Sequence, residues 1–210
     1  MPSFLIALTL GACILSVFIV VAAVIRARKL NTLHINAVKS RRLLENALFS
    51  RAQHAQEFAD SGALDIASAV LLKSAAQDAA HAVDLPLVDD GLDSLSLKIP
   101  AGTIDATYSE LVAYSKERNE NLAAEDRLSV ESELSRVLQL TVDELDRDEL
   151  DTHEKLLLSK LERDRRDVRM TRRFHNTHVS QARRVRRSRF TRSLRLAGRA
   201  PMPQTVDLVD

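Results

Sequence analysis

The sequence predicts an all-α protein, in which a single N-terminal transmembrane helix is followed by an elongated antiparallel four-helix bundle. An apolar run of 22 residues without a charge extends from Phe4 to Ile25. Beyond it, apolar side chains recur at the three- and four-residue steps of a helix. The 210-residue chain has no Trp, two Tyr, six Phe and five Gly, a composition that disfavours β-sheets. We therefore expect a transmembrane anchor over 1–26, a helical bundle over 27–192 and a C-terminal tail over 193–210.

The apolar run is long enough to be the anchor. At 1.5 Å per residue its helix covers about 33 Å, and the hydrocarbon core of a bilayer is ~30 Å thick. Arg26, Arg28 and Lys29 follow the run at once, whereas no basic residue precedes it. Basic residues flank the cytoplasmic end of a span, so we expect a single-pass protein of the cell membrane with its N-terminus outside and its body cytoplasmic.

Two other interpretations of the N-terminus are less favoured. A cleaved signal peptide has a basic start and a shorter apolar core, and Met1, Pro2 and Ser3 carry no basic side chain. The sequence Leu-Gly-Ala-Cys at 10–13 resembles a lipobox and makes Cys13 a candidate for lipidation, but the chain stays apolar up to Ile25. We interpret Cys13 as an ordinary apolar side chain in lipid. Small residues at 7 and 11 would allow two copies to pair as a homo-oligomer.

The body divides into helical segments. We expect a first helix over about 27–60, which ends at Ser61-Gly62, and a second over about 64–83. Whether the anchor continues into the first helix stays open. The first helix carries an apolar stripe of Leu30, Leu33, Ala37, Leu44, Leu48, Ala55 and Phe58.

Pro and Gly residues then interrupt the pattern from 84 to 103, which favours a loop over a short strand. A third helix should start near 105, with a possible break, and reach about 149. The last helix should cover about 151–192. Four helices with a period near 3.6 favour the bundle.

Charge is strongly segregated along the chain. Residues 105–154 carry 15 acidic and 5 basic side chains, and residues 165–199 carry 13 Arg and one acid. The acidic side chains that could form a docking patch are Asp143, Glu144, Asp146, Asp148 and Glu149. The basic side chains that could contact a membrane surface or another anionic partner are Arg183, Arg184, Arg186, Arg187, Arg189, Arg192 and Arg195.

Three interpretations of the Arg-rich segment stay open. Its charges could pair with the acidic residues of the bundle, bind the anionic inner leaflet, or bind a nucleic-acid backbone. Nucleic acid is the least favoured partner, and aromatic side chains that could stack on the bases of a single strand are nearly absent.

No residue pattern indicates catalysis, a metal or a cofactor. The chain has no Gly-rich phosphate loop and no nucleophile elbow. His175 and His178 have a spacing that can hold a metal on one helix face, but the neighbouring Arg residues would repel a cation. His153-Glu154 lacks the second His of a zinc-protease helix, because position 157 is Leu. We interpret the histidines at 34, 54 and 81 as surface or boundary residues.

Two segments resemble the LemA family. Ala-Glu-Asp-Arg-Leu-Ser at 124–129 resembles the entry to that family's third long helix. Arg-Arg-Phe-His-Asn-Thr-His-Val at 172–179 is similar to its Arg-Arg-Tyr-Asn segment. The organisation of the chain is also similar to that of the family: it has an N-terminal span, a first helix with Arg51, and a late Gly/Pro tail. The resemblance implies a membrane-anchored helical protein without an established enzymatic activity, and it names no catalytic residue.

We therefore expect a non-enzymatic, membrane-anchored interaction or scaffold protein. Its partners would be the lipid bilayer, above all an anionic inner leaflet, and a protein that the sequence does not identify. The alternative is a membrane-tethered nucleic-acid-binding or regulatory protein that uses residues 183–199.

Overall fold

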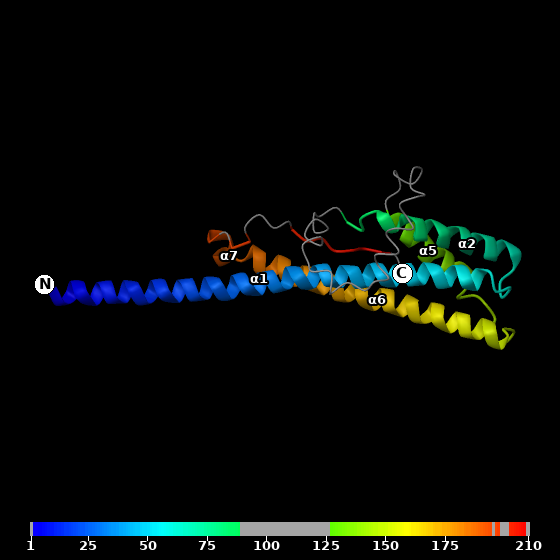
Figure 1. Cartoon of the computed structure of the whole chain (residues 1–210), viewed down its shortest axis with the longest axis horizontal. Coiled ribbons are helices and arrows are strands. Elements are labelled where there is room, and N and C mark those ends of the chain that lie inside the picture. The colour runs from blue at the N-terminus through cyan, green and yellow to red at the C-terminus, as the bar shows by residue number, and fades with distance from the viewer. Residues whose placement is uncertain (1, 89–126, 195, 198–201, 209–210) are drawn as a thin grey trace.

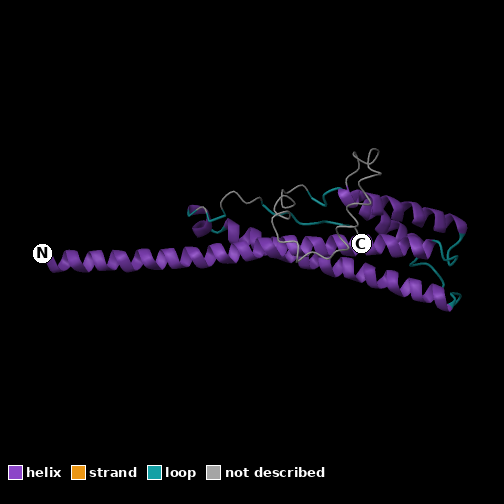
Figure 2. Cartoon of the chain, in the orientation of Figure 1, coloured by secondary structure: helices purple, strands orange, loops and turns teal. Residues whose placement is uncertain are grey.

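The regular structure of this protein is helical. The computed structural model contains the whole chain, and the structure describes residues 2–88, 127–194, 196–197 and 202–208. Within these ranges every regular element is a helix and no strand is present (Figure 2). The predicted helical class is thus confirmed. The arrangement as a four-helix bundle stays a prediction, because the loop expected over most of 84–103 and the start of the third helix fall in 89–126, outside the described residues.

The first helix, α1 (Pro2–Ala59), is a single uninterrupted helix of 58 residues. Its N-terminal part projects beyond the other helices as a rod (Figure 1). There the apolar side chains stand exposed, with 69% of Ile14, 72% of Phe18 and 62% of Ile25 accessible. By length and composition this helix could cross a membrane. The anchor and the first body helix are therefore continuous, a question that the sequence left open.

The second part of α1 buries the predicted stripe. All seven stripe residues, from Leu30 to Phe58, are buried, as their spacing predicted. The helix ends where expected, because Gly62 adopts φ = 93°, a left-handed conformation that side chains other than glycine disfavour. The hydroxyl of Ser61 donates to the carbonyl of Phe58 at 2.7 Å and satisfies one of the free carbonyls of the last turn.

The long helix α6 (Thr152–Arg187) lies antiparallel to α1 (Figure 1). Three contacts establish the direction, because residue numbers rise on one helix as they fall on the other. Arg26 meets Phe190 just beyond the end of α6, Ala37 meets His175, and His54 meets Asp164. The basic C-terminal end of α6 is thereby brought back to the point where the exposed apolar part of α1 ends.

Two shorter helices complete the far end of the body. Helix α2 (Ile66–His81) begins at the N-cap Asp65, is followed by the 3₁₀ turn η1 (Ala82–Asp84), and packs on α1. Helix α5 (Arg127–Thr141) packs on α2. One core cluster joins all four helices, with Ala76 and Ala79 of α2, Phe58 of α1, Leu134 of α5 and Leu161 of α6 among its buried members. The small Ala side chains allow α2 to approach its neighbours closely.

The predicted extension of the third helix to about 149 is wrong, because α5 ends at Thr141. Acidic residues follow at once, and negative charge is unfavourable at the C-terminal end of a helix. The carboxylate of Asp146 instead accepts from the backbone N–H of Asp148 at 3.0 Å, which stabilises a turn. A capping box then starts α6: Asp151 accepts from Glu154 N–H at 2.7 Å, and Glu154 accepts from Asp151 N–H at 2.8 Å.

The last predicted helix, over about 151–192, is divided in two. Helix α6 ends at Arg187, Ser188 is extended, and the short helix α7 (Arg189–Ser193) follows. The hydroxyl oxygen of Ser188 accepts from Thr191 N–H at 3.3 Å and so caps α7.

Residues 202–208 then run along the body as a loop (Figure 2). Val206 and Leu208 join a second core cluster with Leu44, Leu48 and Val168. This part of the tail is packed on the helices.

Candidate functional site

The predicted basic residues gather at one end of the body. Five of them lie on the last turns of α6 and on the first residue of α7, and Arg192 follows within α7. The side chains of Arg184, Arg187, Arg189 and Arg192 are exposed, and those of Arg183 and Arg186 are half-buried. Arg195 lies outside the described residues. We call this region, together with Arg26 and Lys29 of α1, the basic end.

The basic end is fixed against the start of the body by a cation–π contact. The guanidinium carbon of Arg26 lies 5.0 Å from the ring centroid of Phe190. Arg26 is the first charged residue after the apolar run, so this contact places α7 beside the end of the projecting rod. A guanidinium over an aromatic face contributes about 0.5–1 kcal/mol at an exposed site. Sequence reasoning treated Arg26 only as an orientation signal and missed its role in positioning α7.

Two open clefts lie at the basic end. The interhelical cleft, of about 570 Å³, lies between α1 and the end of α6, with Leu33 and Val185 as its apolar lining. Its polar lining consists of Arg26, Lys29, Gln181, Arg184 and Ser188.

The outer cleft, of about 460 Å³, is lined by Ser180, Arg183, Arg184, Arg187 and Ser188. The two clefts therefore share Arg184 and Ser188. The described residues that line the two clefts include no Asp or Glu.

His34 lies close to the basic end and is buried, which corrects its interpretation as a surface or boundary residue. Only 8% of the residue is accessible. Burial, and then the charge of Arg186, lower the pKa of His34 below its usual 6.5. The ring is therefore neutral at pH 7. It adds no charge to a region that is already strongly positive.

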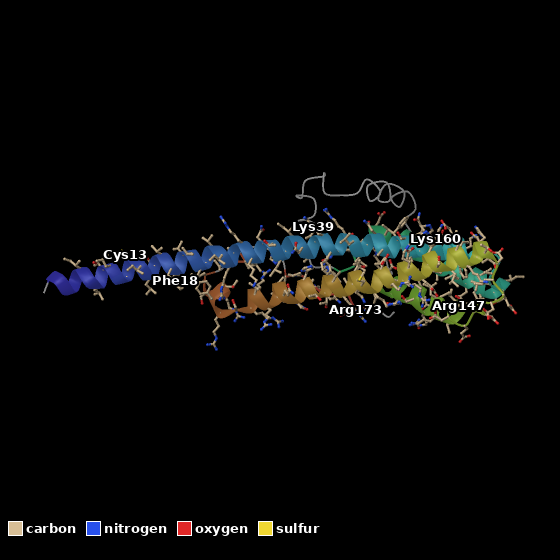
Figure 3. The ribbon with its side chains drawn as sticks, turned by 90° about the horizontal axis from the view of Figure 1, so that it is seen from below. Cys13, Phe18, Lys39, Arg147, Lys160 and Arg173 are labelled. Carbon is tan, nitrogen blue, oxygen red and sulfur yellow. The ribbon has the colours of Figure 1, made fainter. Side chains whose placement is uncertain are left out.

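The predicted acidic patch lies at the opposite end of the body. Asp143, Glu144, Asp146, Asp148 and Glu149 are exposed in the connection between α5 and α6. A helix of 36 residues such as α6 is about 54 Å long, so the patch and the basic end cannot pair within one chain. Figure 3 shows this separation, with Arg147 near one end and Cys13 and Phe18 on the projecting rod beyond the other.

Local partners neutralise part of the acidic patch. Arg165 donates two hydrogen bonds to the carboxylate of Asp143, at 2.5 and 2.9 Å. This pairing lowers the pKa of Asp143. Arg147, which lies among the patch carboxylates in sequence, pairs instead with Glu162 of α6 at 2.6 Å. Arg165 belongs to the Arg-dense stretch 165–199, so part of the predicted pairing within one chain is present here. The arginines from 183 to 192 lie at the opposite end of α6 and do not reach the patch.

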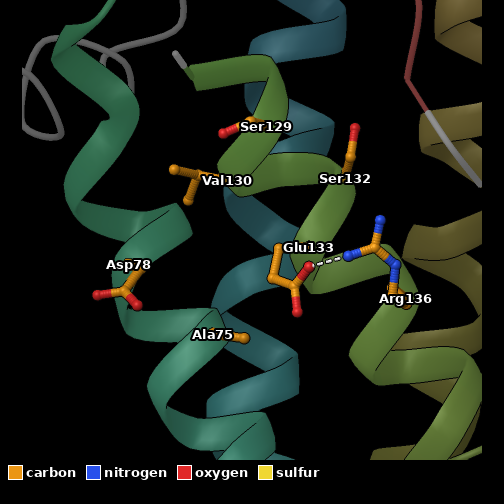
Figure 4. A pocket seen from close by; sticks show the side chains of 7 residues that line it. All are labelled: Ala75, Asp78, Ser129, Val130, Ser132, Glu133 and Arg136. Carbon is orange, nitrogen blue, oxygen red and sulfur yellow. Dashed lines mark hydrogen bonds and ion pairs between the residues drawn. The ribbon is translucent and has the colours of Figure 1, made fainter. Parts of the chain in front are cut away.

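A further cleft lies between α2 and α5 (Figure 4). Its charged lining residues Glu133 and Arg136 pair with each other on the surface of α5, and both are more than half exposed. Asp78 lies across from them on α2. Exposed pairs of this kind contribute little energy. The hydroxyl of Ser132, in the same lining, donates to the carbonyl oxygen of Leu128 at 2.6 Å.

The two histidines with metal-ligand spacing have separate structural contacts. His175 is fully buried, and its Nδ1 lies 3.1 Å from the hydroxyl of Ser40 and 3.2 Å from the carbonyl oxygen of Ala37. A carbonyl only accepts, so Nδ1 carries the proton. His178 packs edge-on against Phe174, with ring centroids 4.4 Å apart. Within the described ranges no three His, Cys, Asp or Glu side chains converge as metal ligands.

Of the two segments that resemble LemA motifs, 172–179 has structural contacts in this protein, whereas 124–126 of the other lie outside the described residues. Asn176 donates to the carbonyl of Val206 at 2.9 Å and accepts from its N–H at 2.8 Å, and Arg172 donates to the carbonyl of Leu208 at 2.6 Å. Both residues thus hold the C-terminal segment on α6. Arg51 forms a buried ion pair with Glu131 of α5.

Cys13, the candidate for lipidation, lies exposed within the apolar part of α1. No family model, no curated protein and no solved structure matches the chain. The site thus defines only a class of protein: a helical body with a projecting apolar helix and a basic surface at the base of that helix.

Proposed function

We propose that this protein is a non-enzymatic, membrane-anchored interaction protein. In this proposal the apolar part of α1 crosses a cell membrane once, and the body, an elongated antiparallel bundle of the LemA type, lies on the cytoplasmic side. The observation that carries the proposal is the contact between Arg26 and Phe190. It holds the Arg-rich end of α6 at the level where the apolar run ends, which is where the headgroups of the inner leaflet would lie.

The mechanism is positional. Each basic residue near an anionic leaflet contributes about 1 kcal/mol, so the basic end would hold the body upright against the inner leaflet. The acidic patch would then stand about 54 Å away from the membrane, the length of α6, and face a protein partner. If two copies pair in one membrane, they are parallel. Their acidic patches then lie side by side, and opposite charge cannot drive the pairing.

Membrane topology is the first test. A reporter fused after Asp210 that is active on only one side of the membrane should report the cytoplasmic side, and acylation labelling at Cys13 should be negative. The charge asymmetry around Arg26, Arg28 and Lys29 is the reason for this expectation. A reporter active outside the cell, or a lipidated Cys13, would contradict the proposal and remove the inner leaflet as a partner.

A membrane-tethered nucleic-acid-binding protein is the alternative, because Arg residues suit phosphate contacts. The full-length protein in neutral vesicles and in anionic vesicles should be challenged with duplex DNA across a salt series. We expect retention of DNA to be weak, and weaker still in the anionic vesicles. In this test the anionic lipid competes with the DNA phosphates for the same basic residues. Strong DNA binding that survives anionic lipid would favour the alternative.

A further inference from the structure

The two clefts of the basic end form one continuous surface for an anion with two charged groups. Arg26 and Lys29 line the interhelical cleft from α1, and Arg183 and Arg187 line the outer cleft from α6. Arg184 belongs to both. Five cationic side chains thus surround two adjoining recesses, with no carboxylate among the described residues that line them. Like charges that line one surface repel one another, and an anion bound between them relieves this repulsion.

The chemistry of the lining favours phosphate groups. Arginine forms paired hydrogen bonds with the oxygens of a phosphate, and lysine adds a compact charge. Gln181 offers further hydrogen-bond donors in the interhelical cleft. The hydroxyl of Ser188 lies 2.8 Å from that of Thr191, so Ser188 serves the cap of α7 as well as the cleft wall. Both recesses can therefore take one phosphate each, with Arg184 between the two.

The position of the interhelical cleft favours a lipid as the source of the phosphates. Arg26 follows directly on the apolar run, and Leu33 and Val185 give the cleft an apolar lining beside its charges. A soluble anion gains nothing from contact with apolar side chains, whereas the glycerol and the first methylene groups of a lipid would be buried against them. The acyl chains would then extend along the exposed apolar side chains of α1.

We infer that the basic end is a binding site for an anionic glycerophospholipid whose headgroup carries two phosphates joined by glycerol, a diphosphatidylglycerol. This inference rests on the proposed function, because the lipid reaches the clefts only if α1 spans the membrane. One phosphate binds among Arg26, Lys29 and Arg184, and the other among Arg183, Arg184 and Arg187. Basic pockets between transmembrane helices on the cytoplasmic side are known to bind headgroups of this kind.

The test measures lipid retention by the full-length protein in a non-ionic detergent, using native mass spectrometry. The protein is offered diphosphatidylglycerol, or phosphatidylglycerol at twice the molar concentration so that phosphate and charge are equal, or neutral phosphatidylcholine. Wild type is compared with Arg184→Gln, Lys29→Gln and the control Arg173→Gln. Arg173 is exposed on the same helix α6 and lines neither cleft, so its variant loses the same charge at another place.

We expect diphosphatidylglycerol to be retained above phosphatidylglycerol at equal phosphate. Arg184→Gln should lower its retention about fivefold, the effect of about 1 kcal/mol, while Arg173→Gln changes it little. Arg184→Lys, which keeps the charge, should retain more lipid than Arg184→Gln. Arg184 is exposed, and circular dichroism of each variant should match wild type.

Other outcomes overturn the inference in distinguishable ways. Equal retention of both anionic lipids, or an equal loss in Arg173→Gln, would mean general attraction to an anionic surface, so that the site fails and the proposed function stands. If neither anionic lipid is retained above phosphatidylcholine, both the lipid site and the inner-leaflet contact of the proposed function are contradicted. Displacement of the lipid by soluble pyrophosphate at an equal phosphate concentration would show that the clefts recognise a free anion and not a lipid.

Discussion

Arg51 of α1 and Glu131 of α5 form a buried ion pair, with 2.8 Å between Nη2 and Oε2. Only 2% of Arg51 and 1% of Glu131 is accessible. Arg51 also donates to the hydroxyl of Ser135 at 2.7 Å and to the carbonyl oxygen of Glu131 at 3.1 Å. Arg127 lies 3.8 Å from the same carboxylate and donates to the carbonyl oxygen of Leu85 at 2.7 Å. These buried charges thus join α1, α5 and the segment after α2.

Replacing Arg51 by Leu should strongly destabilise the protein, because it removes the closest partner of a buried carboxylate. Loss of one member of a buried pair costs about 3–5 kcal/mol. Urea unfolding in detergent micelles, followed by circular dichroism, measures the change in the free energy of unfolding. The matched control is Arg136→Leu on α5, whose pair with Glu133 is more than half exposed and should contribute under about 1 kcal/mol. Equal losses in the two variants would contradict the assignment.

Replacing Asn176 by Ala should release the C-terminal segment from α6. The variant loses both hydrogen bonds to Val206, and a buried backbone group left without its partner costs about 1–3 kcal/mol. Hydrogen exchange of the amides at 202–208 should accelerate, while exchange in α2 stays unchanged. Asn176→Asp keeps the acceptor for Val206 N–H but loses the donor, so its exchange should lie between wild type and Asn176→Ala. Unchanged exchange in both variants would show that apolar packing alone holds the segment.

Replacing Asp151 by Ala should shorten α6 at its start. The capping box with Glu154 satisfies two backbone N–H groups, and loss of an N-cap costs about 1 kcal/mol. The free energy of unfolding should fall by about that amount, with faster exchange confined to the first turn of α6. Asp148→Ala removes a carboxylate three residues earlier that caps no helix and serves as the control. A similar loss in both variants would indicate a general charge effect.

His34 should make stability fall on acidification. Its pKa in the folded protein is lowered from 6.5, so the unfolded chain binds more protons as the pH falls below 6.5. The free energy of unfolding therefore decreases as the pH falls from 6.5, until the pH reaches the lowered pKa of the folded protein. Urea unfolding at pH 7.5, 6.5 and 5.5, chosen around the ordinary His pKa of about 6.5, should show a weaker pH dependence in His34→Gln. An identical pH dependence in the two proteins would assign the effect to other groups.

Local patterns were enough to predict several elements. The stripe from Leu30 to Phe58 predicted the buried face of α1, because helical periodicity is a property of neighbouring residues. Gly62 also marked the end of α1, because the positive φ that favours glycine is a property of the turn itself and needs no distant contact. The end of α5 was missed. Apolar residues at 142 and 145 continued the pattern, whereas the turn that Asp146 forms ended the helix.

Long-range contacts decided the remaining features. Asn176 and Val206 are 30 residues apart, and Arg51 and Glu131 are 80 apart, so no local pattern could join them. Burial of His34 and His175 follows from the packing of α6 on α1 and not from their neighbours in sequence.

The sequence by itself determined the composition of this protein's two charged regions, the length of its apolar run and the helical class, because each depends on residues close together in the chain. The tertiary structure alone decided where the charges lie. Folding α6 antiparallel to α1 carries the Arg-rich end back to Arg26 and leaves the acidic patch about 54 Å away. The physical reason is that a rigid helix separates its ends by its whole length, while its apolar face fixes which neighbour each end meets.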